Sequence, residues 1–218
     1  MKFLKSSGLL VIISSPSGAG KSSLARELVD SDPNLSFSIS FTTREKRRGE
    51  LDGKDYFFVD ISTFKNLSEK GDMLEYAKVF GNYYGTPKAP IELGLMEGKD
   101  FVFDVDWQGG DQIRSSDFSE NVVSIFILPP SISELENRLL GRRQDSKKIV
   151  SNRMAEAKSE IEHWKEYDYV LVNNEFHKTL DEIRAIVKAS RLALCRNSSL
   201  ESFVVGLNCE FEERKNKV

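Results

Sequence analysis

The chain has 218 residues, of which 39% are hydrophobic, and its 31 basic and 34 acidic side chains give a formal net charge of −3 at pH 7. A chain of this length can bury roughly 70% of the surface that it exposes when unfolded, so we expect one well-cored domain without disulfide or metal staples. The near balance of charge excludes a protein-wide basic field, so we expect no nucleic-acid partner and only local anion sites.

The amino-terminal stretch contains one short apolar run, residues 9–13. This run is far shorter than a signal-peptide core or a membrane span. The two cysteines, Cys195 and Cys209, match neither a metal-binding pair nor a secreted disulfide framework. We expect free thiols in a reducing compartment, with a disulfide as the less favoured alternative. The sequence therefore predicts a cytoplasmic protein that does not associate with membranes.

Apolar runs alternate with helical patterns along most of the chain. Residues 9–13 form a continuous run without polar alternation, which is typical of a strand buried on both faces of a parallel sheet. A glycine-rich loop follows, and then a segment with Leu24 and Leu28 on one helical face. The alternation predicts an α/β fold, a parallel sheet flanked by helices. Further strands are predicted at 101–106, 122–128 and 169–173, and further helices at 131–140, 147–167 and 179–197.

Two segments depart from this alternation. Residues 36–90 are rich in aromatic side chains, glycine and threonine, which predicts a small β-rich insertion. Residues 131–149 include the basic stretch RLLGRRQDSK, whose composition suits a mobile lid better than a core. We therefore predict one domain over 1–218, with its core at 8–35, 91–130 and 150–197 and a carboxyl-terminal extension at 198–218.

The loop Ser-Pro-Ser-Gly-Ala-Gly-Lys-Ser at 15–22 matches the Walker A pattern except at its first position, where Ser15 replaces glycine. Backbone N–H groups of such a loop point inward at a helix start and bind phosphate. Lys21 would reach the β- and γ-phosphates, and the Ser22 hydroxyl would ligate Mg²⁺. The alternative is a serine- and glycine-rich turn that only caps a helix. The predicted phosphate-binding residues are Ser15, Pro16, Ser17, Gly18, Ala19, Gly20, Lys21, Ser22 and Ser23.

From this loop onward the sequence resembles the guanylate kinase family, bacterial type. The resemblance rests on SSPSGAGKSSL, FSISFTTREKRRGELDGKDYFF, GDMLEYAKVFGNYYGTP, FVFDVDWQG and RLLGRRQDS, followed by NRMAEAKSEIEHWKEYDYVLVNNEF. These blocks stand in the family's order and cover about residues 8–197. The resemblance implies Mg²⁺-assisted transfer of the γ-phosphoryl group of ATP to GMP, and to dGMP, in purine nucleotide metabolism. It also implies that the insertion at 36–90 binds GMP.

Arginines in TTREKRRG offer planar guanidinium groups that suit bidentate contact with a phosphate. A charge run is otherwise usually a solvated face. The resemblance implies that Arg44 and Arg47 hold the GMP phosphate together with Tyr56 and Tyr84, and it leaves Arg48 as a surface residue.

Glu75 carries two acceptor oxygens, which suit the paired donors on the N1–H and 2-amino groups of guanine. Taken alone, a glutamate after Met-Leu would be read as an exposed helical residue. The resemblance implies that Glu75 reads the base, that Ser40 and Thr86 complete its site, and that Gly85 adjoins it.

Asp104 and Asp106 end a predicted strand, where α/β folds place ligand groups. Their two-residue spacing directs both side chains to one face. The resemblance implies that Asp104 holds Mg²⁺ through water, with Ser22 as the direct ligand, and that Asp106 faces GMP. The alternative is a pair of caps in the turn after the strand.

The remaining predicted residues come from the carboxyl-terminal half. The resemblance implies that Arg138, Arg142 and Arg153 neutralise charge on the transferring phosphoryl group together with Lys21, and that Asn173 lies near the adenine of ATP. Arg143 replaces a glycine of the family pattern, which would stiffen the lid or add a cation.

Two other functions stay open at the level of the sequence. The first is a guanylate-kinase-like binding module without phosphoryl transfer, and the second is a kinase for another monophosphate or small metabolite. The intact GKS and the arginines disfavour the first, and Glu75 disfavours the second. We expect ATP and GMP as partners, and the sequence allows a homo-oligomer.

Overall fold

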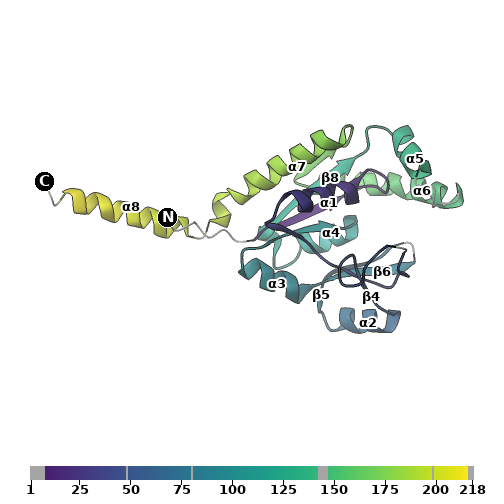
Figure 1. The fold of residues 1–218 in the computed structure, drawn as a ribbon, viewed down its shortest axis with the longest axis horizontal. Helices are drawn as coiled ribbons and strands as arrows, with labels where there is room; N and C mark the ends of the chain where they lie inside the picture. The colour runs from purple at the N-terminus through teal and green to yellow at the C-terminus, as the bar shows by residue number, and fades with distance from the viewer. Residues whose placement is uncertain (1–7, 48, 80, 142–146, 198, 216–218) are drawn as a thin grey trace.

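A five-stranded parallel sheet forms the centre of the molecule (Figure 1). The computed structural model describes residues 8–47, 49–79, 81–141, 147–197 and 199–215. The strand order is β2-β7-β1-β8-β9, and each neighbouring pair is parallel. The strands are β1 Leu10–Ser14, β2 Leu35–Phe37, β7 Asp100–Asp104, β8 Val122–Leu128 and β9 Tyr169–Val172.

The central strand β1 is buried on both faces, as its apolar run predicts. Val11 and Ile13 pack into one hydrophobic cluster, and Leu10 and Ile12 pack into a second. This division follows from the two-residue period of a strand, which sends alternate side chains to opposite faces. The amino-acid run without polar interruption therefore builds the middle of a three-layer structure.

Helices cover both faces of this sheet. The helices α1 and α7 contribute Leu28 and Ile183 to the cluster on one face, and α3 and α4 contribute Ile91 and Ile113 to the cluster on the other (Figure 1). The predicted fold class, a parallel α/β sheet flanked by helices, is confirmed. The helices are α1 Lys21–Ser31, α3 Lys88–Met96, α4 Trp107–Arg114, α5 Ile132–Gly141, α6 Lys147–Glu162 and α7 Phe176–Arg191.

A second sheet of four strands stands beside the first, in the order β4-β3-β6-β5. Helix α2 packs on it through the buried Phe64, whose ring stacks on Tyr83 at 5.4 Å. The stretch SFSISFTT crosses from one sheet to the other, because residues 35–37 pair with β7 whereas residues 41–42 pair with β6. The elements are β3 Phe41–Thr42, β4 Phe57–Phe58, α2 Ile61–Glu69, β5 Met73–Val79 and β6 Asn82–Pro87.

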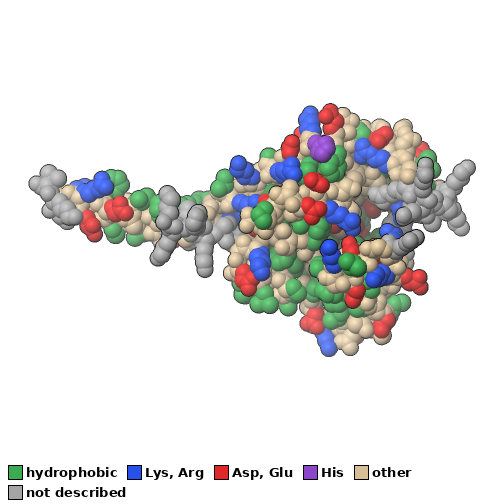
Figure 2. Space-filling view, in the orientation of Figure 1, with side chains coloured by type: hydrophobic (Ala, Val, Ile, Leu, Met, Phe, Trp, Pro, Cys, Tyr) green, Lys and Arg blue, Asp and Glu red, His purple; other side chains and the backbone are tan. Residues whose placement is uncertain are grey.

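Helix α8, Leu200–Lys215, projects away from the two sheets (Figures 1 and 2). Its side chains from Glu201 onward are exposed, including Phe203 and Phe211. The described part of the charged carboxyl-terminal end is therefore exposed to solvent, and it is helical up to residue 215. Both cysteines are free and exposed. Among the described residues, no helix is both long enough and apolar enough to cross a membrane.

Candidate active site

The loop at residues 15–20 joins β1 to α1, and its backbone adopts a shape that requires glycine at two positions. Gly18 has φ 99° and Gly20 has φ 102°, in the region that side chains disfavour. A Cβ on Gly20 would also lie 2.5 Å from Asn173 Nδ2. That amide donates a hydrogen bond to the carbonyl of Ala19 at 2.7 Å. Asn173 therefore supports the loop directly, and its predicted place near adenine stays a prediction.

Lys21, the first residue of α1, points across the ends of the central strands. Its Nζ lies 2.6 Å from Asp104 Oδ1 and donates to the carbonyl of Val105 at 3.0 Å. The parallel pairing of β1 with β7 explains this contact, because it brings the carboxyl ends of both strands to the same edge. The loop thus presents its cation at the edge where an α/β sheet binds ligands.

Asp104 remains ionised at the end of β7. Burial pushes its pKa upward, but the charge of Lys21 and the hydroxyl of Ser22 outweigh burial and hold the pKa below its usual value. No group of three or more acidic, histidine or cysteine side chains among the described residues could hold a metal by itself. A magnesium ion that keeps several waters and binds substrate phosphates needs only one or two protein ligands. Ser22 and Asp104 therefore fit the predicted Mg²⁺ site.

Glu75 on β5 is a buried carboxylate, with a relative exposure of 3%. Its Oε1 accepts a hydrogen bond from Thr86 Oγ1 at 2.6 Å, and Thr86 Oγ1 in turn lies 3.0 Å from Ser40 Oγ. Burial raises the pKa of Glu75 to about 7, although Thr86 opposes the shift. A Cβ on Gly109 would lie 2.8 Å from Glu75 Oε2, so the start of α4 closes over this oxygen. The three predicted base-reading residues are thus assembled into one hydrogen-bonded group.

Contacts within the protein hold Arg44 in place. Its Nη2 lies 2.7 Å from Glu50 Oε1, and its guanidinium stands 5.5 Å from the centre of the Tyr56 ring. Burial opposes the charged form, but Glu50 outweighs burial and raises the pKa of Arg44 further. Glu50 also accepts from the backbone N–H of Arg47 at 2.8 Å. The loop that carries both arginines is thus folded around one carboxylate.

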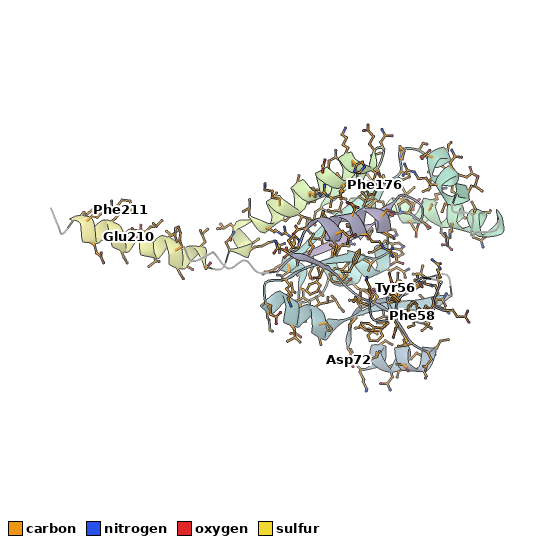
Figure 3. All side chains as sticks on the ribbon, viewed as in Figure 1. Tyr56, Phe58, Asp72, Phe176, Glu210 and Phe211 are labelled. Atoms are coloured by element: carbon orange, nitrogen blue, oxygen red, sulfur yellow. The ribbon has the colours of Figure 1, made fainter. Side chains whose placement is uncertain are left out.

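A cavity of about 240 Å³ joins the loop to the second sheet. The Tyr56 and Tyr84 rings meet edge to face at 6.0 Å beside it, and Figure 3 shows Tyr56 between the two sheets. Gly85 contributes no side chain, and a Cβ there would lie 2.9 Å from the Glu75 carbonyl. Six of the predicted residues that line the cavity are Lys21, Ser40, Arg47, Glu75, Asp104 and Arg153.

Asp106 has a structural role whichever ligand it faces. Its Oδ1 accepts from the Gly109 N–H at 3.0 Å and caps the first turn of α4. The alternative interpretation of a strand-end cap therefore describes Asp106, although this residue also lines the cavity. Asp104 is no cap, because it pairs with Lys21.

The three arginines predicted to neutralise the phosphoryl charge do not all lie at the cavity. Arg153 on α6 lines the cavity. Arg138 on α5 pairs with Glu134 at 2.9 Å and donates to the carbonyl of Asn173 at 3.2 Å, so it lies behind the loop. Arg142 is outside the described residues. The roles of all three stay predictions.

One acidic side chain at the loop was not predicted. Glu160 on α6 accepts a hydrogen bond from the backbone N–H of Ser17 at 3.1 Å. Its only sequence signal is its spacing of seven residues from Arg153, which places both on one side of the helix. A second cavity, of about 190 Å³, lies beside the Glu160 carboxylate, and its lining includes Ser15, Pro16, Ser17 and Gly18. Ser23 is exposed on α1.

A parallel sheet with a glycine loop, a lysine and a strand-end aspartate at one edge defines a P-loop nucleotide-binding protein. Comparisons with known proteins narrow the class. A sequence profile described as guanylate kinase matches residues 7–190. The chain is 54% identical over 207 residues to the guanylate kinase of Cereibacter sphaeroides, covering 95% of this chain and 98% of that one. It is 49% identical to that of Rhizobium meliloti, covering 93% and 92%.

A solved structure agrees with these relatives. The crystal structure of guanylate kinase from Anaplasma phagocytophilum is similar with a TM-score of 0.76 and 39% identity, over 91% of this chain and 94% of that chain. The chain belongs to the guanylate kinase family. It is accordingly a nucleoside monophosphate kinase, and the family's reaction is phosphoryl transfer from ATP to GMP.

Proposed function

We propose that the two ends of the 240 Å³ cavity hold the two substrates of this transfer. The loop at 15–22 binds the ATP phosphates, and the group of Glu75, Thr86 and Ser40 binds the guanine of GMP. This assignment is supported by one observation: Lys21 and Glu75 line the same cavity. A substrate bound at each end would place its phosphate between them, which is the arrangement that direct transfer needs.

Lys21 and Arg153 would stabilise the transferring phosphoryl group by charge, because a loose transition state leaves little covalent chemistry for the protein. Arg138 and Arg142 are proposed to join them from the lid. Ser22 and Asp104 would hold Mg²⁺, which when bound supplies further positive charge at the phosphates. Asp104 is suited to this role because Lys21 keeps it ionised.

The acceptor's phosphate would bind Arg44 and Arg47, and Tyr56 and Tyr84 would flank it. Burial raises the pKa of Tyr56 to about 12, so its hydroxyl remains a hydrogen-bond donor. We also propose dGMP as an acceptor, because these contacts concern base and phosphate and none is assigned to the ribose 2′-hydroxyl.

Arg44→Ala is expected to raise the KM for GMP by about 10- to 100-fold and to leave the KM for ATP nearly unchanged, since hydrogen bonds to charged groups contribute roughly 1.5–3 kcal/mol. Steady-state ADP formation with each substrate varied checks it. Arg184→Ala, which removes a helix-surface arginine paired with Asp181, is the matched control. A rise in the ATP constant alone would place the acceptor site elsewhere.

Acidification is expected to weaken GMP use before it harms the fold. Glu75 must be ionised to accept both guanine donors, and its pKa of about 7 means that protonation removes this form as the pH falls through 7. We expect kcat/KM for GMP to fall towards tenfold per pH unit below that point. The phosphate of GMP itself titrates near pH 6, and this titration affects wild type and variants alike. The pH profile of kcat/KM for Glu75→Gln should therefore lack only the fall near pH 7.

The raised pKa of Glu75 affects stability in the opposite direction: acidification stabilises the fold, although it weakens the binding of GMP. A carboxyl group whose pKa is raised on folding stabilises the folded state below its usual value of 4.5, and this contribution disappears as the pH rises through about 7. Thermal unfolding at pH 5 and pH 8 in wild type and Glu75→Gln would separate this effect. If the unfolding temperature of Glu75→Gln changed between pH 5 and pH 8 by as much as that of the wild type, the assigned pKa would be contradicted.

We further propose a cytoplasmic location, which the free thiols of Cys195 and Cys209 support. The division into core, insertion at 36–90 and lid at 131–149 stays a prediction, as does the homo-oligomer. Sedimentation velocity of the full chain measures the oligomeric state.

A further inference from the structure

A carboxylate of α6 uses one of the loop's backbone donors. Glu160 Oε2 accepts from Ser17 N–H at 3.1 Å, and the proposed transfer assigns Glu160 no role. Backbone N–H groups of such a loop are the groups that bind phosphate oxygens. A carboxylate oxygen therefore occupies a donor of the kind that the phosphates of a nucleotide require.

The surrounding charges indicate that Glu160 and a nucleotide phosphate compete for the Ser17 N–H. Glu160 lines a cavity of about 190 Å³ together with Ser17, Gly18, Lys21 and Asp106. The cavity thus holds two carboxylates and one lysine, into which a nucleotide brings several further negative charges. Like charges a few ångströms apart repel one another, and a loop N–H that points at Glu160 cannot point at a phosphate.

The surroundings of Glu160 disfavour its charged form. Burial raises its pKa, and the nearby Asp106 and Glu156 act in the same direction, whereas the Ser17 N–H and Lys21 oppose the shift. A carboxylate with a raised pKa is less stable as an anion in its site than in water. Moving Glu160 out into solvent recovers this hydration.

We propose that Glu160 is a placeholder for a nucleotide phosphate, which accepts from the Ser17 N–H when no nucleotide is bound and is displaced by the phosphate chain of an incoming nucleotide. This inference rests on the proposed function, because it takes 15–22 as the loop for the ATP phosphates. Arg153 lies seven residues earlier on the same side of α6 and lines the adjoining cavity. The helix therefore presents a competing anion and an assisting cation to the two halves of one site.

Glu160→Gln tests the placeholder, because the amide keeps an acceptor oxygen for Ser17 N–H but loses the charge. We expect the Kd values for Mg²⁺–ADP and for inorganic pyrophosphate, measured by isothermal titration calorimetry, to fall by roughly 5-fold, the effect of removing one nearby repulsion. ADP release in stopped flow should slow by a similar factor. Glu160→Ala, which removes the acceptor as well, should keep the gain in affinity.

Glu162→Gln is the matched control, since it makes the same charge change at an exposed position two residues later on α6, on a side of the helix that does not face Glu160. Its Kd should stay at the wild-type value. Unchanged or weaker binding in both Glu160 variants would overturn the proposal and make Glu160 a support of the loop. An equal gain in Glu162→Gln would overturn it too, because the effect would then be one of net charge. Lys21→Met is measured alongside: if it does not weaken ADP binding, the assignment of the loop itself fails, whatever Glu160 shows.

Discussion

Lys21→Met is expected to lower kcat by about 10² or more, a loss of at least ~3 kcal/mol of transition-state stabilisation, in an enzyme that still folds. The reason is local charge. Lys21 is the cation of the loop, and it stands 2.6 Å from Asp104 at the edge of the sheet where the phosphates are proposed to bind. Methionine preserves the length of the side chain but brings no charge to that position.

Rates of ADP formation at saturating ATP and GMP measure this effect. Lys65→Met is the control, because Lys65 is exposed on α2. The loss of Lys21 also leaves Asp104 without its ion pair, so circular dichroism and thermal unfolding must show that the variant is folded. Near wild-type turnover in a folded Lys21→Met protein would remove Lys21 from the catalytic group.

Glu75→Gln is expected to lower kcat/KM for GMP, with a loss of ~2 to 4 kcal/mol of transition-state stabilisation, and to leave ATP binding intact. The reason is that the amide replaces a charge-assisted acceptor and points a donor at the base. Glu75 has no alternative role on the surface, because only 3% of it is exposed. Its Oε1 accepts a hydrogen bond from Thr86, and the carboxylate lines the cavity in which the base is proposed to bind.

Kinetics with GMP, IMP and AMP separate reading of the base from support of the fold. Glu69→Gln, at the exposed end of α2, is the matched control. GMP should lose most, and IMP, which lacks the 2-amino group, should lose less. Equal losses for all three acceptors would mean that Glu75 stabilises the insertion and does not read the base.

The sequence predicted well those features that depend on neighbouring residues. The uninterrupted run at 9–13 predicted β1, and GKS after glycine predicted where α1 begins, because both patterns arise from local period and backbone geometry. The fold class followed from the alternation of such segments. The resemblance supplied Glu75, Thr86 and Ser40, which the structure brings together.

Contacts between distant segments could not be predicted in this way. Asn173 supports the loop through a hydrogen bond to a residue 154 positions away, which no local pattern encodes. Residues 36 and 37 belong to the main sheet because they pair with β7, although they fall within the insertion predicted at 36–90. Glu160 reads as an ordinary charged helix residue until α6 packs beside the loop.

The acceptor preference of the wild-type enzyme tests the central proposal most directly, with kcat/KM for ATP-dependent phosphorylation measured for GMP, IMP, AMP, CMP and UMP. A buried carboxylate that pairs with the N1–H and 2-amino groups should favour GMP over AMP by roughly 10⁴ to 10⁵, because AMP would leave the site's acceptors unpaired. IMP should fall between them. Phosphorylation of AMP or a pyrimidine nucleotide within tenfold of GMP would contradict a guanine site built on Glu75.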